Sequence, residues 1–198
     1  MTEASFANLS LRPELARALS EVFHYENMTQ VQAQAIPVCL KGGDVLAKAK
    51  TGTGKTLGFL LPALDTVLKG PQMRRGQIAV LVVSPTRELA MQTAAEATQL
   101  LTFCPGCTVE TVLGGTNMKR EQRALEQGPF VLVATPGRLN DHLENSGLDR
   151  RLSDLKVRGT VVVVVVADMG KKGGEKREKR GDKKKRVATD TCSPFPQL

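Results

Sequence analysis

The chain has 198 residues, of which 41% are hydrophobic and four are cysteines, and it carries a formal net charge of +8. This is the length of one ordinary α/β domain. No apolar run approaches the roughly 18 residues of a membrane span, residues 1–15 lack the basic and apolar regions of a secretory signal, and four cysteines are too few for a disulfide framework at this length. We expect a monomer inside the cell, in the nucleus or cytoplasm, with an organelle left open.

Most of the positive charge is concentrated near one end of the chain. Residues 171–186 hold 10 basic and 3 acidic side chains, whereas residues 1–170 hold 18 and 16. Such a segment cannot bury enough apolar area to offset its ordering entropy, so we predict that 171–198 are a disordered basic tail. It is either a nuclear address, a nonspecific RNA tether or solvated sequence without a role. Binding of a nucleic acid by the nearly neutral body must therefore depend on particular residues.

The order of the expected elements indicates an α/β fold. Two amphipathic helices are predicted at 11–22, behind Ser10, and at 31–38. Short apolar runs follow at 45–47, 78–83, 109–113, 130–134 and 157–166, and helical stretches separate them at 55–68, 88–101 and 119–125. Strands that are apolar throughout are typical of a parallel sheet with helices on both faces.

A glycine-rich loop stands between the run at 45–47 and the helix that follows. It consists of Ala49, Lys50, Thr51, Gly52, Thr53, Gly54, Lys55 and Thr56. Glycines let the backbone N–H groups turn inward, and the helix N-terminus favours anions, so the loop predicts a nucleotide site. Lys55 is expected to reach the β and γ phosphates and the Thr56 hydroxyl to ligate Mg²⁺, which makes these two the candidate catalytic residues.

Residues upstream of the loop carry a resemblance to a known family. Phe6 is followed, after 17 residues, by His24-Tyr25-Glu26-Asn27-Met28-Thr29-Gln30-Val31-Gln32. This resembles the Q motif of the DEAD-box RNA helicases, with His24 where a glycine is usual. The resemblance implies that the cofactors are ATP and Mg²⁺, that Gln32 reads the adenine edge and that Phe6 packs on the base. The alternative is that Gln32 is a surface residue of its helix.

Three further motifs each follow an apolar run. They are Pro85-Thr86-Arg87-Glu88-Leu89-Ala90, Gly114-Gly115 and Thr135-Pro136-Gly137-Arg138. Open α/β sheets bind ligands at the carboxyl ends of their strands. In the family that the chain resembles, these motifs hold single-stranded RNA by its backbone. The predicted RNA-binding residues are Pro85, Thr86, Arg87, Gly115, Thr135, Pro136, Gly137 and Arg138. The alternative is that they are β-to-α turns rich in glycine and proline for steric reasons.

The resemblance extends from Phe6 to about Val157. The family continues with Asp-Glu-Ala-Asp where Val161–Val164 stand here, and its Ser-Ala-Thr motif and second lobe have no counterpart. Asp168 is either a strand-end residue or, in a shifted register, the metal-side aspartate. We expect a truncated or alternatively spliced product whose residues 158–198 come from outside the family core.

These observations predict the first, RecA-like lobe of a DEAD-box ATP-dependent RNA helicase. Its segments are a Q-motif segment at 1–42, an incomplete ATP-binding lobe at 43–170 and the basic tail at 171–198. The family reaction is ATP hydrolysis coupled to RNA unwinding, and we expect this chain to bind its ligands with turnover near zero. The alternative is a non-enzymatic nucleotide- or RNA-binding fragment that regulates a full-length helicase.

Two weaker signals are expected to be structural. Cys104 and Cys107 have C-x-x-C spacing, but no second pair completes a zinc site and the pair lies in a connection into a strand, so a loop turn is predicted. His142 is expected on a surface helix, without a partner that suggests catalysis.

Overall fold

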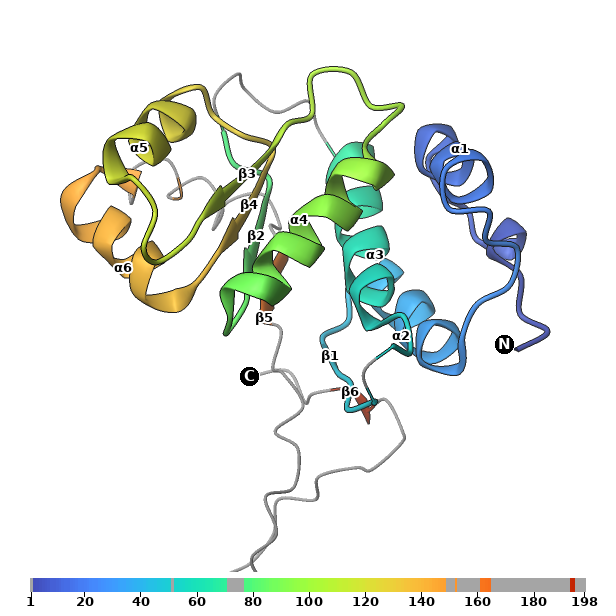
Figure 1. Ribbon diagram of the computed structural model, residues 1–198. Coiled ribbons are helices and arrows are strands. Elements are labelled where there is room, and N and C mark those ends of the chain that lie inside the picture. Colours follow the sequence, from blue (N-terminus) through green and yellow to red (C-terminus); the bar gives the residue numbers. More distant parts are fainter. Residues whose placement is uncertain are drawn as a thin grey trace, which may run out of the picture.

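A computed structural model describes residues 2–50, 52–70, 77–148, 152, 161–164 and 193–194 of this chain. Each predicted helix and strand before the last has a counterpart whose ends lie within two or three residues of the expected bounds (Figure 1). Of the last strand, predicted at 157–166, the structure describes the central residues 161–164. The helices are η1 (Phe6–Asn8), α1 (Pro13–Glu21), α2 (Gln30–Leu40), α3 (Lys55–Lys69), α4 (Arg87–Leu100), α5 (Met118–Glu126) and α6 (Pro136–Asn145). The strands are β1 (Val45–Leu46), β2 (Val80–Val83), β3 (Val109–Val112), β4 (Val131–Ala134), β5 (Val161–Val164) and β6 (Ser193–Pro194).

Four strands form the central sheet in the order β3-β4-β2-β5, and every neighbouring pair is parallel. Their registers align the C-terminal ends of the strands, and we call the edge that these ends form the level edge of the sheet. Val83 pairs with Ala134 on one side and with Val164 on the other, and Val112 also pairs with Ala134. Because the strands are parallel, the segments that leave β2, β3 and β4 all begin at one edge of the sheet.

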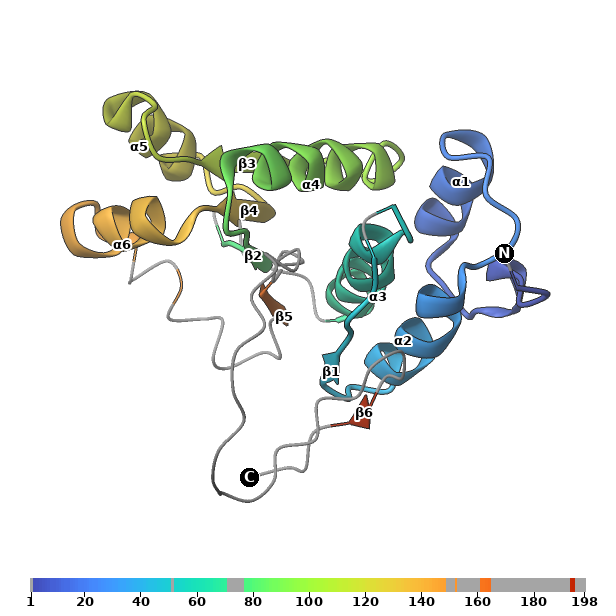
Figure 2. The same cartoon turned by 60° about the horizontal axis from the view of Figure 1, so that its bottom comes forward.

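Helices cover both faces of this sheet, as the sequence predicted. Alternate residues of each strand point to opposite faces, so Val80, Val82, Val131 and Val133 join one buried cluster with residues of α1 to α4. Leu81 and Leu132 join a second cluster with Leu125 of α5 and residues of α6. Figure 1 shows α3 and α4 on one side of the sheet and α5 and α6 on the other. Helices α1 and α2 lie beyond α3, on its side away from the sheet (Figure 2).

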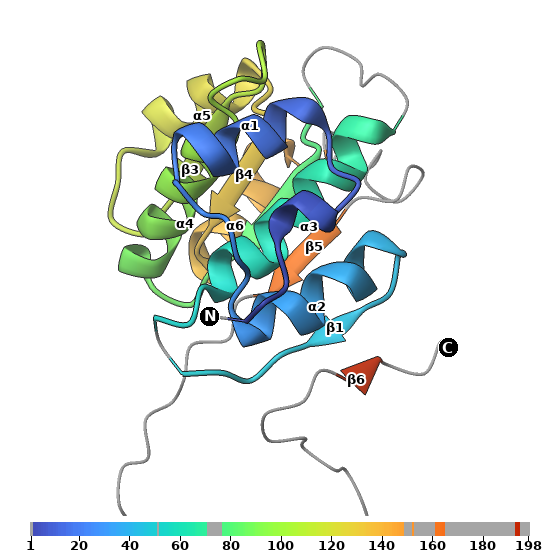
Figure 3. The same cartoon turned by 90° about the vertical axis from the view of Figure 1, so that its right-hand side faces the viewer.

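Strand β1 departs from the predicted parallel sheet. It pairs antiparallel with β6, Val45 with Pro194 and Leu46 with Ser193, and among the described strands it has no partner in the four-stranded sheet. Figure 3 shows β1 beside α2. Leu46 is 57% exposed. The apolar run of 45–47 indicated a strand, but a run of three residues carries no information about its partner. Apart from β6, residues 171–198 lie outside the described residues.

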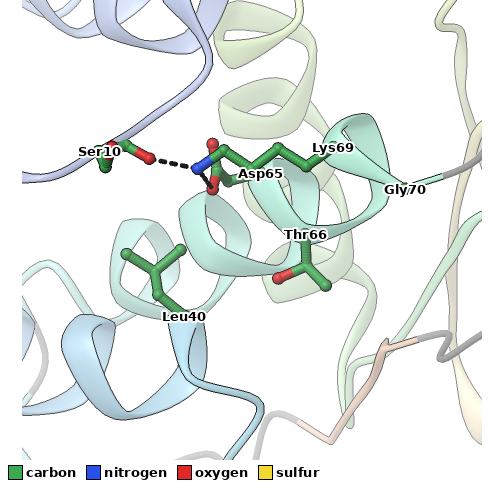
Figure 4. Close-up of a pocket in the computed structure, with 6 residues that line it drawn as sticks. All are labelled: Ser10, Leu40, Asp65, Thr66, Lys69 and Gly70. Atoms are coloured by element: carbon green, nitrogen blue, oxygen red, sulfur yellow. Dashed lines mark hydrogen bonds and ion pairs between the residues drawn. The ribbon is translucent and has the colours of Figure 1, made fainter.

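The N-terminal segment is attached to α3 through a buried carboxylate. Asp65 is 1% exposed. Its Oδ1 accepts a hydrogen bond of 2.7 Å from the Arg12 backbone N–H, and its Oδ2 lies 2.7 Å from Lys69 Nζ. Lys69 also donates to the Ser10 carbonyl, and these groups line a pocket at the C-terminal end of α3 (Figure 4). In the part of the chain that the structure describes, no helix is long and apolar enough to cross a membrane.

Replacing Asp65 tests this attachment. We expect Asp65→Ala to lower the free energy of unfolding by about 1–3 kcal/mol, because the Arg12 N–H is left without its acceptor. Asp65→Asn keeps one acceptor oxygen and should lose less. Denaturant unfolding measures the difference, with Asp44→Ala as the control at an exposed position. Equal stability of Asp65→Ala and the control would contradict the attachment.

Candidate functional site

The loop between β1 and α3 has the backbone of an anion-binding turn. Gly52 and Gly54 have φ of 77° and 75°, in the left-handed region that favours glycine. Gly54 is the N-cap of α3 and provides no side-chain cap, so the first N–H groups of this 15-residue helix are available to a ligand. Lys55 Nζ donates to the carbonyls of Ala49 and Lys50, which keeps the ammonium beside the same turn. Backbone amides at a helix N-terminus and an ammonium are the donor set that phosphate oxygens need.

The start of α2 is hydrogen-bonded to this loop. Thr29 Oγ1 donates to the Thr53 carbonyl at 2.9 Å, and Gln32 Nε2 donates to the Gly54 carbonyl at 3.0 Å. Gln32 Oε1 accepts from the Thr29 N–H at 2.8 Å, which completes a capping box on α2. Gln32 is 3% exposed, so the alternative that it is a surface residue is wrong. Its amide still has one N–H and one lone pair for a ligand.

The segment that precedes α2 lies against the N-terminal residues. The Phe6 N–H donates to the Glu26 carbonyl at 3.0 Å, and the Met28 N–H donates to the Ala4 carbonyl at 2.8 Å. These bonds hold Phe6 close to the predicted Q motif, with its ring 5% exposed in the core. His24 has a φ of 54°. A glycine is favoured in that conformation, which explains why glycine is usual at this place in the motif.

Thr56 has a carboxylate neighbour that sequence reasoning missed, Glu96 of α4. Burial raises the pKa of Glu96, and the nearby Thr56 side chain opposes part of that increase. The sequence did contain a signal for Glu96: it stands three residues after Thr93 and next to Ala97, both of which face the core. The predicted magnesium ligand Thr56 is half-buried.

The motif after β2 is exposed at the level edge of the sheet. Thr86 caps α4, its Oγ1 accepting from the Leu89 N–H at 3.3 Å, and Pro85, Thr86 and Arg87 are all exposed. The Arg87 guanidinium lies against Gly115 of the next motif. A Cβ at Gly115 would stand 3.1 Å from Arg87 Nη1, and its φ of 83° also favours glycine. The structure thus places these two predicted RNA-binding motifs side by side.

The motif after β4 is joined to the same glycine turn. Thr135 is buried, and its Oγ1 accepts from the Gly114 N–H at 3.2 Å. Pro136 and Gly137 are exposed at the start of α6, which has no side-chain cap. A Cβ at Gly137 would meet no atom within 4 Å, so an extended chain has room to approach the helix N-terminus here.

A buried acid, Glu121 of α5, lies behind these turns and was missed by sequence reasoning. Its Oε2 accepts from Arg138 Nε at 2.7 Å and from His142 Nε2 at 2.8 Å. Its Oε1 accepts from the Leu113 N–H at 3.1 Å and from the Thr116 hydroxyl. Helix α6 lies at the surface, as expected, but His142 is its one fully buried side chain. The partner that makes its burial favourable comes from another helix, 21 residues earlier.

The electrostatics of Glu121 follow from these contacts. Burial by itself raises the pKa of the Glu121 carboxyl, but the hydrogen bonds from His142, Thr116, the Leu113 N–H and Arg138 together hold it below its usual value. The carboxylate is therefore charged at neutral pH. The sequence contained a signal for it, since Glu121 and Leu125 are one turn apart on the inward face of α5.

The C-x-x-C pair forms the predicted loop turn. The Cys107 N–H donates to the Cys104 carbonyl at 3.3 Å. Burial raises the pKa of the Cys104 thiol to about 11, which disfavours the reactive thiolate. Within the described ranges, no three His, Cys, Asp or Glu side chains are grouped as metal ligands.

The geometry defines a phosphate-loop nucleotide-binding domain with a second polar edge formed by three β-to-α turns. The sequence profile of the DEAD/DEAH box helicases matches residues 29–168, and the chain belongs to this family. The match continues eleven residues beyond Val157, where we expected the resemblance to end. Asp168 lies outside the described residues.

Curated relatives agree with the family. The chain is 49% identical over 163 residues to DEAD-box ATP-dependent RNA helicase 26 of Arabidopsis thaliana, an alignment that covers 79% of this chain and 19% of the relative. It is 50% identical over 163 residues to DEAD-box ATP-dependent RNA helicase 31 of Oryza sativa subsp. japonica, covering 79% of this chain and 30% of the relative. The chain thus spans less than a third of the length of these relatives.

The two loop glycines form a matched pair for testing the link between Gln32 and the phosphate loop. Alanine at either position is strained by about 1–2 kcal/mol, because both have positive φ. At Gly54 the new Cβ would also lie 2.4 Å from Gln32 Nε2, whereas at Gly52 it would meet nothing within 4 Å. We expect Gly54→Ala to lower the thermal midpoint more than Gly52→Ala. Equal losses would show that the Gln32 contact contributes nothing.

The charge on Glu121 predicts a pH dependence. Because its pKa is lowered in the folded state, its contribution to stability is complete above the unfolded value of 4.5 and is lost as the pH falls through the folded value. We expect Glu121→Gln to cost about 1–3 kcal/mol at neutral pH. Denaturant unfolding along a pH series should show this cost shrinking below pH 4.5. Glu144→Gln, at an exposed site, is the control and should show no such trend.

Proposed function

We propose that this chain binds ATP with Mg²⁺ at residues 49–56 and single-stranded RNA along the level edge of the sheet. The observation that carries the proposal is the direct bonding of the capping box on α2 to the phosphate loop, through Thr29 to Thr53 and Gln32 to Gly54. A loop that binds only phosphate groups does not require a side-chain amide such as that of Gln32 next to it. An amide that donates and accepts together matches the adenine edge and leaves guanine mismatched.

Particular residues would hold each part of the nucleotide. The N–H groups at the start of α3 and the Lys55 ammonium would bind the β and γ phosphates, and Gln32 would contact the base. The Thr56 hydroxyl would hold Mg²⁺. The bound ion would neutralise phosphate charge and orient the phosphate oxygens. Phe6, beside the Q-motif segment, would limit the space around the base.

The RNA site would use the three turns at the ends of β2, β3 and β4. Arg87 is exposed next to Gly115, and the N-terminus of α6 is open at Gly137. A guanidinium, glycine N–H groups and a helix N-terminus bind phosphates without reading bases. We therefore propose binding that does not depend on RNA sequence.

We propose that this chain binds its ligands but hydrolyses ATP slowly. In the register of the family motif, Val161–Val164 carry no acid to position an attacking water. The relatives are named as ATP-dependent RNA helicases. For this chain we propose ligand binding with slow hydrolysis, which would allow it to compete with a complete helicase for nucleotide or RNA.

Calorimetry with nucleotides tests the proposal. We expect the chain to bind ATP and ADP in the presence of Mg²⁺ more tightly than GTP and GDP. Lys55→Ala should abolish binding, since it removes the phosphate-binding ammonium. Gln32→Ala should reduce the preference for adenine by about tenfold or more, because one missing hydrogen bond to the base is worth about 1–2 kcal/mol.

Two controls make the result decisive. Gln34→Ala changes an exposed amide on the same helix and should leave both affinity and selectivity unchanged. RNA-stimulated steady-state hydrolysis that disappears in Lys55→Ala would refute slow turnover. A monodisperse, folded chain that releases no heat with any adenosine polyphosphate would overturn the whole proposal.

A further inference from the structure

We propose that Glu121 and Arg138 act as a positioning pair for the RNA-binding turns, and that Arg87, not Arg138, supplies the guanidinium that contacts phosphate. The inference rests on the proposed RNA function and assigns different roles to the two arginines of that site. Both were predicted from sequence as phosphate ligands, but the structure places them in very different surroundings.

Two of the five N–H donors of Arg138 are already hydrogen-bonded to protein acceptors. Nε donates to Glu121 Oε2 at 2.7 Å, and Nη2 donates to the Thr116 carbonyl. Nη1 lies 3.9 Å from Asp141, and the side chain is 12% exposed. A guanidinium bonded through Nε and Nη2 cannot turn toward a phosphate without breaking its bond to a buried carboxylate, which is costly.

The surroundings of Arg87 differ from those of Arg138. It is exposed, and no ion pair or side-chain hydrogen bond joins it to another described residue. Its guanidinium lies beside Gly115, so the charge stands next to the glycine turn at the same edge of the sheet. An exposed arginine at this edge is free to bind a phosphate.

Glu121 connects the two remaining turns through one carboxylate. It bonds the Leu113 N–H at the end of β3 and the Thr116 hydroxyl in the glycine turn. Through Arg138 and His142 it also contacts two successive turns of α6. The Thr135 bond to the Gly114 N–H adds a further connection between the same turns.

The consequence is preorganisation of the N–H groups that face RNA. With both turns bonded to Glu121, the backbone of Gly115 and the N-terminus of α6 are fixed relative to each other before RNA arrives. Ordering two flexible turns on binding would reduce affinity. Because Arg138 and Glu121 neutralise each other, the pair adds no net charge to the phosphate-binding edge. Its effect on RNA affinity should therefore be geometric.

Salt dependence separates a phosphate ligand from a positioning residue. Loss of one phosphate contact to a single strand lowers the slope of log K against log salt by about 0.7, whereas a geometric effect leaves the slope unchanged. Lysine keeps the charge of arginine but not its planar fork. A matched series of Arg87→Lys, Arg87→Gln and Arg138→Lys therefore assigns the two roles.

The experiment is fluorescence anisotropy with a short labelled single-stranded polyuridylate at several salt concentrations. We expect Arg87→Lys to bind nearly as well as the wild-type chain and Arg87→Gln to lose about 0.7 of the slope. Arg138→Lys should weaken binding about tenfold, as expected for lost charge-assisted hydrogen bonds, with the slope unchanged. ADP affinity should not change in any of the three, which a general loss of structure would not permit.

A second variant keeps the inference testable if Arg138→Lys does not fold. The double variant Glu121→Gln with Arg138→Gln preserves net charge and leaves no unpaired buried charge. It should retain the wild-type slope and bind RNA more tightly than Arg138→Gln alone. A slope lowered by about 0.7 in the double variant would identify Arg138 as a phosphate ligand.

The possible failures are distinguishable. Wild-type RNA affinity in Arg138→Lys, with an undiminished slope in Arg87→Gln, would overturn the assignment of roles while leaving RNA binding by the lobe intact. A wild-type chain that binds ADP but no RNA would overturn the RNA part of the proposed function, and this inference with it.

Discussion

The level register of the parallel strands is the constraint on which the site depends. Val83, Ala134 and Val112 are paired across β2, β4 and β3, so the three turns that follow start at the same height. A shift of one residue in any pair would exchange the side chains that pack on the two faces and disrupt their fit against the helices. Both faces of the sheet are buried. The hydrophobic effect therefore maintains the register, and the register brings Thr86, Gly115 and Thr135 to one edge.

Two buried carboxylates then fix what the sheet has brought together. Asp65 attaches the N-terminal segment to α3, and Glu121 joins the turns after β3 and β4. Both accept hydrogen bonds from groups distant in sequence. Removing one would leave buried donors without acceptors, which costs more than the bonds themselves contribute. Carboxylates here act as connectors between elements.

The fold and much of the candidate site could be predicted from sequence because their signals are local. Apolar runs and helical spacing found the helices and strands, and the motifs gave Gln32, Lys55 and Arg87 from their neighbours in the chain. Glu96 and Glu121 were missed, because the sequence around each gives no sign of the neighbour that another element places beside it. The burial of His142 was missed for the same reason: it is favourable only because Glu121 faces it.

The pairing of strand β1 could not be predicted from sequence either. Its apolar run identified a strand, but its antiparallel partner is Ser193–Pro194, nearly 150 positions further along the chain, in a stretch whose composition predicted no strand at all.

The amino-acid order by itself determined that this is an α/β protein with a phosphate loop and three turn motifs after its strands, because glycines, caps and apolar periodicity act over a few residues. Only the tertiary structure decided which of two similar arginines faces solvent. Arg87 and Arg138 both follow a β-strand within a turn motif, and nothing nearby in sequence separates them. The difference is a buried carboxylate brought from α5, and burial depends on contacts between segments that are far apart in the chain.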